Sequence, residues 1–267
     1  MDLISAGSRR RLAATLASLG LMLFASSAVL AQSKSITIAA EDDWPPYSSA
    51  KADKSGPEGM TPDLVRAIFK TRGIEVKYLV VPFSRCLHLV KTGKVVACFN
   101  TSITEENKNE FLWHPTPLFF SGTSIFALSE SGAPKQAIKA QELEGQTVGV
   151  TAGYTYPAEF RTNPKIKFTE ASSDELLLKM LMAKRVKYAV LSSLPGLVRI
   201  KNDPKLAGHI ALVGELSKDG MWLNFSKSHP EGKDMVAVFE SALLDFKSSG
   251  AYDKFMNDFY QRLGLPR

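Results

Sequence analysis

Aromatic and small polar residues recur where strand-like segments of this 267-residue chain end. Such side chains can stack on a small molecule, donate hydrogen bonds to it or neutralise its charge. In open α/β sheets, ligands bind in the crevice beyond the carboxyl ends of the strands. The positions therefore predict a ligand site, whose candidates are Glu41, Trp44, Phe83, Arg85, Asn100, Ser102, Thr151, Gly153, Tyr154 and Ser193.

The common catalytic and phosphate-binding motifs are missing from the sequence. There is no GxGxxG, GxxxxGK[ST], HExxH, CxxC or GxSxG. The four histidines are widely scattered, so we expect neither a metal site nor a cofactor. Because these motifs are missing from the sequence, an enzyme is the less favoured interpretation.

Residues 1–31 are typical of a secretory signal. Three arginines, Arg9 to Arg11, precede an uncharged apolar run, which ends at Ala31. The alternative is a membrane anchor, which the serines and glycine within the run disfavour. Cleavage after Ala31 would lower the net charge from +6 to +4. Because no basic clusters alternate with aromatics, we expect no nucleic-acid binding and predict an exported, periplasmic protein.

Export makes a disulfide chemically possible. Cys86 falls early in a predicted helix over 84–92, and Cys98 falls late in a predicted strand over 95–99. The rise of the helix and the return of the strand are similar in length, so the two sulfurs can end level. We predict a Cys86–Cys98 bridge, with two buried free thiols as the alternative.

Strand-like and helix-like segments alternate along the rest of the chain, which favours an α/β fold of two similar lobes. Thr61 and Pro62 are predicted to start the helix that ends at Gly73. Ser172 and Glu175 form a predicted capping box. Further strands are expected at 36–40, 74–81, 147–151, 166–170, 188–191 and 210–213, and a short helix is expected from Tyr154.

Over 34–265 the sequence resembles the periplasmic solute-binding proteins of the polar amino acid family, with the type II periplasmic binding fold. The resemblance is carried by Trp44-Pro45-Pro46-Tyr47, Gly59-Met60-Thr61-Pro62-Asp63-Leu64, Ser102-Ile103-Thr104-Glu105-Glu106 and Leu143-Glu144-Gly145. It implies two lobes, 34–126 plus 217–267 and 127–216, joined by crossover strands near 125–128 and 214–223. It also implies a small-molecule ligand and an ABC importer permease as partners, and we expect a monomer.

The resemblance transfers only part of the family's ligand site. Trp44 and Phe83 match aromatic positions, and Asn100 and Ser102 match hydrogen-bonding positions. The arginine that grips an amino-acid carboxylate is replaced by Asn107, which we add to the candidates, and the ammonium-binding aspartate is replaced by Ser193. An ordinary α-amino acid is therefore disfavoured as the ligand.

Three alternatives stay open. Arg85 either supplies the missing cation or is a solvated surface side chain. Some proteins similar to this fold are periplasmic dehydratases, and a buried Glu41 with a raised pKa would then be the general acid. A ligand-sensing module that acts through a separate receptor is a third class.

Overall fold

The computed structural model describes residues 34–129 and 137–264. The predicted signal over 1–31 lies outside these residues. Within the described ranges, no helix combines the length and the apolar character needed to cross a bilayer.

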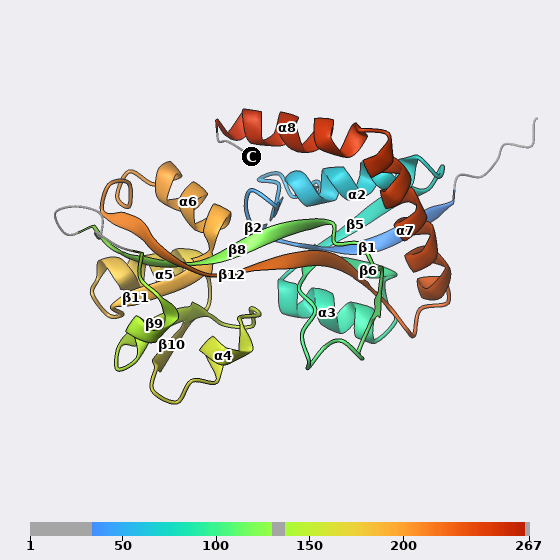
Figure 1. Ribbon diagram of the computed structural model, residues 1–267. Helices are drawn as coiled ribbons and strands as arrows, with labels where there is room; N and C mark the ends of the chain where they lie inside the picture. Colours follow the sequence, from blue (N-terminus) through green and yellow to red (C-terminus); the bar gives the residue numbers. More distant parts are fainter. Residues whose placement is uncertain (1–33, 130–136, 265–267) are drawn as a thin grey trace, which may run out of the picture. The chain divides into compact units, whose positions relative to one another are not determined.

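The first lobe is a parallel sheet covered by helices on both faces. Its elements are β1 (Ser35–Glu41), β2 (Asp43–Trp44), β3 (Ser48–Ala50), β4 (Pro57–Glu58), α2 (Met60–Lys70), β5 (Glu75–Val81), α3 (Phe83–Lys91), β6 (Ala97–Thr101), β7 (Leu112–Trp113), α7 (Gly232–Ser248) and α8 (Ala251–Leu263). β1 pairs in parallel with β5 and β6, so the carboxyl ends of these strands meet at one edge. Figure 1 shows α2 and α8 on one side of the strands and α3 on the other.

The second lobe repeats this plan. Its elements are η1 (Ala140–Leu143), β9 (Thr147–Thr151), α4 (Ala158–Arg161), β10 (Lys167–Ala171), α5 (Asp174–Met182), β11 (Tyr188–Ser192) and α6 (Ser193–Asn202). β9 pairs in parallel with β10 and with β11. Apolar residues of α5 and α6 pack on one face of these strands, and Leu143 and Phe160 pack on the other.

Two long antiparallel strands, β8 (Phe119–Leu128) and β12 (Ile210–Phe225), join the lobes (Figure 1). They pair with each other along most of their length; β12 also pairs with β6, and β8 with β11. The strand order is β10-β9-β11-β8-β12-β6-β1-β5. The predicted fold class, two α/β lobes joined by crossover strands, is therefore confirmed. The boundaries at 126/127 and 216/217 stay a prediction.

Helix α2 begins two residues before the predicted start. Its N-cap is Gly59, at φ 122°, and a Cβ there would lie 2.6 Å from the Tyr47 carbonyl oxygen. The amides of Met60 and Thr61 donate to the Pro46 and Tyr47 carbonyls at 3.1 and 2.8 Å. Because these carbonyls satisfy the exposed amides of the helix start, the Thr61 hydroxyl is not needed as a cap and bonds elsewhere.

Helix α5 is capped by Ser173 and not by Ser172. The Ser173 hydroxyl accepts a hydrogen bond from the Leu176 amide at 3.2 Å. The predicted capping box with Ser172 is therefore wrong by one residue. This shift places Asp174 in the first turn, where a carboxylate complements the helix dipole.

The two cysteines are free thiols in the structure, so the predicted Cys86–Cys98 disulfide is not confirmed. Both are buried in one apolar cluster with Ala39, Phe83 and Val90. Cys86 Sγ lies 3.7 Å from the Val81 carbonyl oxygen, and Cys98 Sγ lies 3.4 Å from that of Phe99. The thiols thus contact backbone carbonyls and otherwise behave as small apolar side chains.

Candidate functional site

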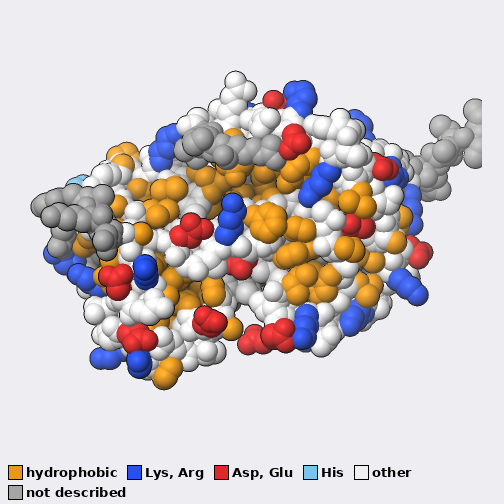
Figure 2. All heavy atoms as spheres, in the orientation of Figure 1, with side chains coloured by type: hydrophobic (Ala, Val, Ile, Leu, Met, Phe, Trp, Pro, Cys, Tyr) orange, Lys and Arg blue, Asp and Glu red, His pale blue; other side chains and the backbone are white. Residues whose placement is uncertain are grey.

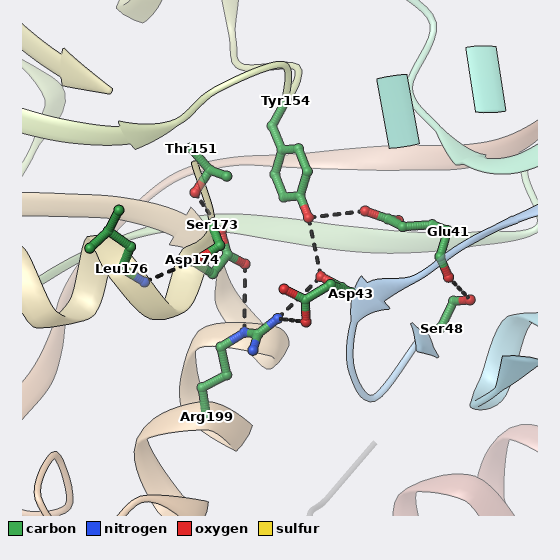
Figure 3. A network of polar contacts seen from close by, with 9 residues as sticks. All are labelled: Glu41, Asp43, Ser48, Thr151, Tyr154, Ser173, Asp174, Leu176 and Arg199. Carbon is green, nitrogen blue, oxygen red and sulfur yellow. Dashed lines mark hydrogen bonds and ion pairs between the residues drawn. The ribbon is translucent and has the colours of Figure 1, made fainter. Parts of the chain in front are cut away.

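The candidate site lies where strand ends of the first lobe meet strand ends of the second. Glu41 ends β1 and Asn100 lies near the end of β6, whereas Thr151 ends β9. Tyr154, three residues after β9, reaches across to Glu41 (Figure 3). On the face drawn in Figure 2, a recess separates the lobes and acidic side chains lie along its margin.

Glu41 is a buried carboxyl group at the centre of this meeting point, with 3% of its surface exposed. Its Oε1 accepts a hydrogen bond from the Tyr154 hydroxyl at 3.0 Å. Its own backbone carbonyl accepts one from the Ser48 hydroxyl at 2.7 Å, which fixes the end of β1 against β3.

Burial raises the pKa of Glu41 from an ordinary 4.5 to about 8. The hydrogen bond from Tyr154 and the nearby Asn100 amide lower it, whereas the negative charges of Asp174 and Asp42 raise it further. No cation is among the groups that set this pKa. The carboxyl therefore holds its proton at neutral pH and can donate or accept a hydrogen bond.

Asn100 has a backbone conformation that side chains rarely adopt, with φ 62°. Its Oδ1 accepts a hydrogen bond from the Thr61 hydroxyl at 2.8 Å, which ties β6 to the start of α2. Its Nδ2 is buried beside Glu41 and has no hydrogen bond of normal geometry among the described residues. A donor is thus left free at the strand end.

Tyr154 also makes an apolar contact between the lobes. Its ring meets Phe83 edge-on, with centroids 6.1 Å apart. It packs against both apolar clusters of the first lobe. Phe83 and Tyr154, both predicted site residues, are therefore in contact with each other.

A second interlobe contact joins Arg199 of α6 to Asp43 of β2. Arg199 Nη2 donates to Asp43 Oδ1 at 2.6 Å and to the Asp43 carbonyl oxygen at 3.1 Å. Arg199 Nε lies 3.9 Å from Oδ2 of Asp174, which accepts a 2.5 Å hydrogen bond from the Thr151 hydroxyl at Oδ1. Burial raises the pKa of Asp174, although Thr151 and Arg199 act to lower it. Figure 3 shows this chain of contacts beside Tyr154.

Sequence reasoning missed Asp43, Asp174 and Arg199. Asp43 lies between two predicted site residues, Glu41 and Trp44, so only its role was overlooked. Asp174 falls in the helix predicted from the Ser172 capping box, Arg199 falls in a segment for which no element was predicted, and no motif marks either residue. Their importance depends on the packing of α5 and α6 beside the end of β9, which the local sequence does not reveal.

Trp44 is 5% exposed and packs on Tyr47, with ring centroids 4.6 Å apart. Its Nε1 has no hydrogen-bond partner among the described residues. Asp174 Oδ2 and Arg199 Nε are also buried without a hydrogen bond there, as is Asn100 Nδ2. Buried polar atoms are normally satisfied, so these four can receive hydrogen bonds from, or donate them to, a solute or water.

Asn107 and Ser102 belong to a self-contained turn. Asn107 Oδ1 accepts from the Thr104 amide at 2.8 Å, and its Nδ2 donates to the Ser102 carbonyl at 2.9 Å. The Ser102 hydroxyl lies 3.6 Å from Met221 Sδ. The Asn107 amide therefore shapes the loop after β6, and its hydrogen-bonding atoms are already used.

Ser193 and Gly153 both lie near strand ends of the second lobe, but Ser193 is hydrogen-bonded to another side chain and Gly153 is exposed. The Ser193 hydroxyl bonds to that of Ser124 at 2.6 Å. A Cβ on Gly122 would lie 2.6 Å from the same Ser193 oxygen, so the backbone approaches closely here. Gly153 has φ 77° and is exposed, which permits the turn that carries Tyr154 toward the first lobe.

Arg85 is exposed on α3, and no described contact joins it to Glu41 or Tyr154. It lines a shallow surface hollow with His88 and Lys94. Arg85 is therefore a solvent-exposed side chain in the structure, and the cation that lies among the carboxylates of the candidate site is Arg199.

Two α/β lobes that meet through buried polar groups at their strand ends define a protein built to enclose a small molecule. The chain belongs to the bacterial extracellular solute-binding proteins of family 3, which it matches over residues 36–262. This confirms the predicted family resemblance and the solute-binding function.

Known relatives agree with this assignment. A probable histidine-binding protein of Campylobacter jejuni is 20% identical over 208 residues, which cover 75% of this chain and 76% of that protein. A mutant of ArgBP from T. maritima has a TM-score of 0.71 and 23% identity, covering 85% of this chain and 95% of that one. A histidine kinase sensor domain with similarity to periplasmic binding proteins has a TM-score of 0.73 and 21% identity, covering 84% and 95%. At these identities the solved structures show the fold alone.

Proposed function

We propose that this protein captures a small polar organic solute between its lobes in the periplasm and delivers it to an ABC importer permease. The observation that carries the proposal is the interlobe contact between Tyr154 and the buried Glu41 carboxyl. A solute inserted there would touch both lobes at once, and contacts to both lobes favour the closed arrangement.

The site supports a polar ligand with both donor and acceptor groups. Glu41 and Asp174 supply oxygen atoms, and Trp44 Nε1 and Asn100 Nδ2 supply N–H groups that have no hydrogen-bond partner of normal geometry among the described residues. The predicted stacking residues, Trp44 and Phe83, are buried in the structure, where Trp44 packs on Tyr47 and Phe83 meets Tyr154. The relatives' names point to amino acids such as histidine and arginine.

An ordinary α-amino acid held in the manner of the family is disfavoured. Asn107 and Ser193 stand where the carboxylate-binding arginine and the ammonium-binding aspartate are expected. Their side chains are committed to the Ser102 turn and to Ser124. Arg199 is the cation nearest this network, and it already faces two carboxylates, Asp43 and Asp174.

Among the residues that the structure describes, none of the groups that set the pKa of Glu41 is a cation, which favours a ligand that carries an amine or a related cation. Binding such a group would release the proton of Glu41 and form a buried ion pair. Its affinity would therefore rise as the pH approaches 8 from below.

A dehydratase-like enzyme is the second candidate, because the raised pKa of Glu41 is the property that a general acid needs. Family membership favours binding without turnover. Incubation with a bound compound separates the two functions, since a binding protein returns its ligand chemically unchanged.

The proposal is tested by thermal unfolding against a panel of amino acids, amines and small organic acids. A ligand present at 100 times its Kd should stabilise the protein by about 2.7 kcal/mol. Tyr154→Phe removes the hydroxyl that bridges the lobes, and should raise the ligand concentration needed by about tenfold.

Tyr188→Phe is the matched control, because Tyr188 starts β11 at the opposite end of the strand from the site. It should respond as the wild type does. If no compound stabilises the wild type, or if Tyr154→Phe and Tyr188→Phe respond alike, the site is wrong.

A further inference from the structure

The guanidinium group of Arg199 lies between carboxylates of the two lobes. On one side its Nη2 is 2.6 Å from Asp43 Oδ1, on β2 of the first lobe. On the other its Nε is 3.9 Å from Asp174 Oδ2, at the start of α5. Arg199 is therefore attached to its own lobe and reaches across to the other (Figure 3).

Arg199 is held firmly on the second lobe. Its side chain is 14% exposed, and that of Asp174 is 2% exposed. Asp174 is fixed in turn by the Thr151 hydroxyl at 2.5 Å. A guanidinium with restricted freedom loses less conformational entropy when it binds a partner than a free surface side chain does.

Asp43 is positioned by the first lobe so that Arg199 meets two acceptors. It lies on β2, which pairs with β3 through Asp43 and Ser49. Arg199 Nη2 contacts both its carboxylate and its backbone carbonyl oxygen, at 2.6 and 3.1 Å. The Tyr154 hydroxyl lies 3.3 Å from the same carbonyl, so two residues of the second lobe converge on this point.

We propose that the Asp43–Arg199 ion pair is an interlobe latch, in which Arg199 is a positioning residue that holds the second lobe closed over the site. The latch favours closure before any solute binds. The effect of the ion pair on closure does not depend on a ligand. Its effect on the affinity for a solute rests on the proposed function.

The latch is expected to be modest in strength. The Asp43 side chain is 51% exposed, so solvent screens the pair. A partly exposed pair of this kind should shift the ratio of closed to open protein about fivefold. Such a bias permits ligand release, which a stronger ion pair would slow.

The test is a double-mutant cycle on the full ligand-free chain, with Asp43→Asn, Arg199→Gln and the double variant. Small-angle X-ray scattering measures the radius of gyration, and hydrogen exchange measures opening at the Tyr154 loop. Each single variant should increase both quantities, and the double variant should add little beyond either single change. Sodium chloride at about 1 M should open the wild type but leave Asp43→Asn unaffected.

Two controls separate the latch from a general structural role. Arg161→Gln removes an ion pair with Glu170 that lies within the second lobe, and should not change closure. Arg199→Lys keeps the charge and should restore closure in part. Arg199→Gln leaves Asp174 without its cation. If that variant fails to fold, Asp43→Asn and the salt series still decide the test.

Additive effects in the cycle, or a wild type whose dimensions do not respond to salt, would overturn the latch. Opening of the variants without any ligand binding in the panel would leave the latch standing and contradict the proposed function. Ligand binding together with unchanged closure in every variant would support the proposed function and contradict the latch.

Discussion

Glu41 is both a buried acid and a point of contact between the two lobes. Its carboxyl is 3% exposed, yet it accepts a hydrogen bond from Tyr154 of the other lobe. Burying a carboxyl group without a cation favours its neutral form. The same property makes the group a partner for a cationic solute and a source of pH dependence.

We predict that Glu41 makes the ligand-free protein less stable as the pH rises toward 8. Its pKa is raised from 4.5 to about 8, so over this range the folded protein holds a proton that the unfolded chain releases. The free energy of unfolding should therefore fall with rising pH, by up to about 1.4 kcal/mol per pH unit from this group. Glu41→Gln is neutral at every pH and should remove that slope, as measured by urea unfolding between pH 6.5 and 8.

The exposed Glu106→Gln is the control and should keep the wild-type slope. The series starts at pH 6.5 because burial lowers the pKa of His114 from 6.5 to about 4, which gives a slope of opposite sign at lower pH. Equal slopes in the wild type and Glu41→Gln would contradict the account of Glu41.

At the residue scale, strand-end position predicts several residues that the structure brings near one another, but not all of their partners. Glu41, Phe83, Asn100, Thr151 and Tyr154 follow from strand-end position, and the structure brings them near one another. Arg199 lies 156 residues from Asp43, and nothing local to either residue predicts their contact. Such pairs depend on how the lobes meet.

Elements were predicted where apolar periodicity is strong and missed where it is weak. The spacing of the buried residues Leu64, Ile68 and Phe69 predicts helix α2. The position at which the helix begins is set by the carbonyl groups of Pro46 and Tyr47. Helix α6 and the small sheet β2-β3-β4 were not predicted. Ser193 directly follows β11, so α6 begins without a loop, and a strand of two residues has no periodicity to detect.

The cap of α5 gives a prediction at the element scale. Ser173→Ala removes the acceptor for the Leu176 amide and should lower the free energy of unfolding by about 1 kcal/mol. Ser172→Ala, at an exposed neighbouring position, should change it little. Urea unfolding of the two variants measures both; equal losses would mean that the cap is misassigned.

For the whole molecule, the long strands β8 and β12 connect two lobes that each have a core of their own. Each lobe has its own buried apolar clusters, and the strands that join them are paired with each other. Closure therefore requires changes in few residues, and polar contacts at the strand ends can decide its equilibrium. The Tyr154–Glu41 and Arg199–Asp43 contacts lie at that position.

Native mass spectrometry tests directly whether a small polar solute binds between the lobes and leaves chemically unchanged. The purified protein, incubated with the compound that gives the largest thermal stabilisation, should carry one ligand per chain. The released compound should have its original mass. The double variant Glu41→Gln, Tyr154→Phe should lose most of the complex, whereas Tyr188→Phe should keep it. A chemically altered ligand, or equal occupancy in the double variant and Tyr188→Phe, would contradict the account.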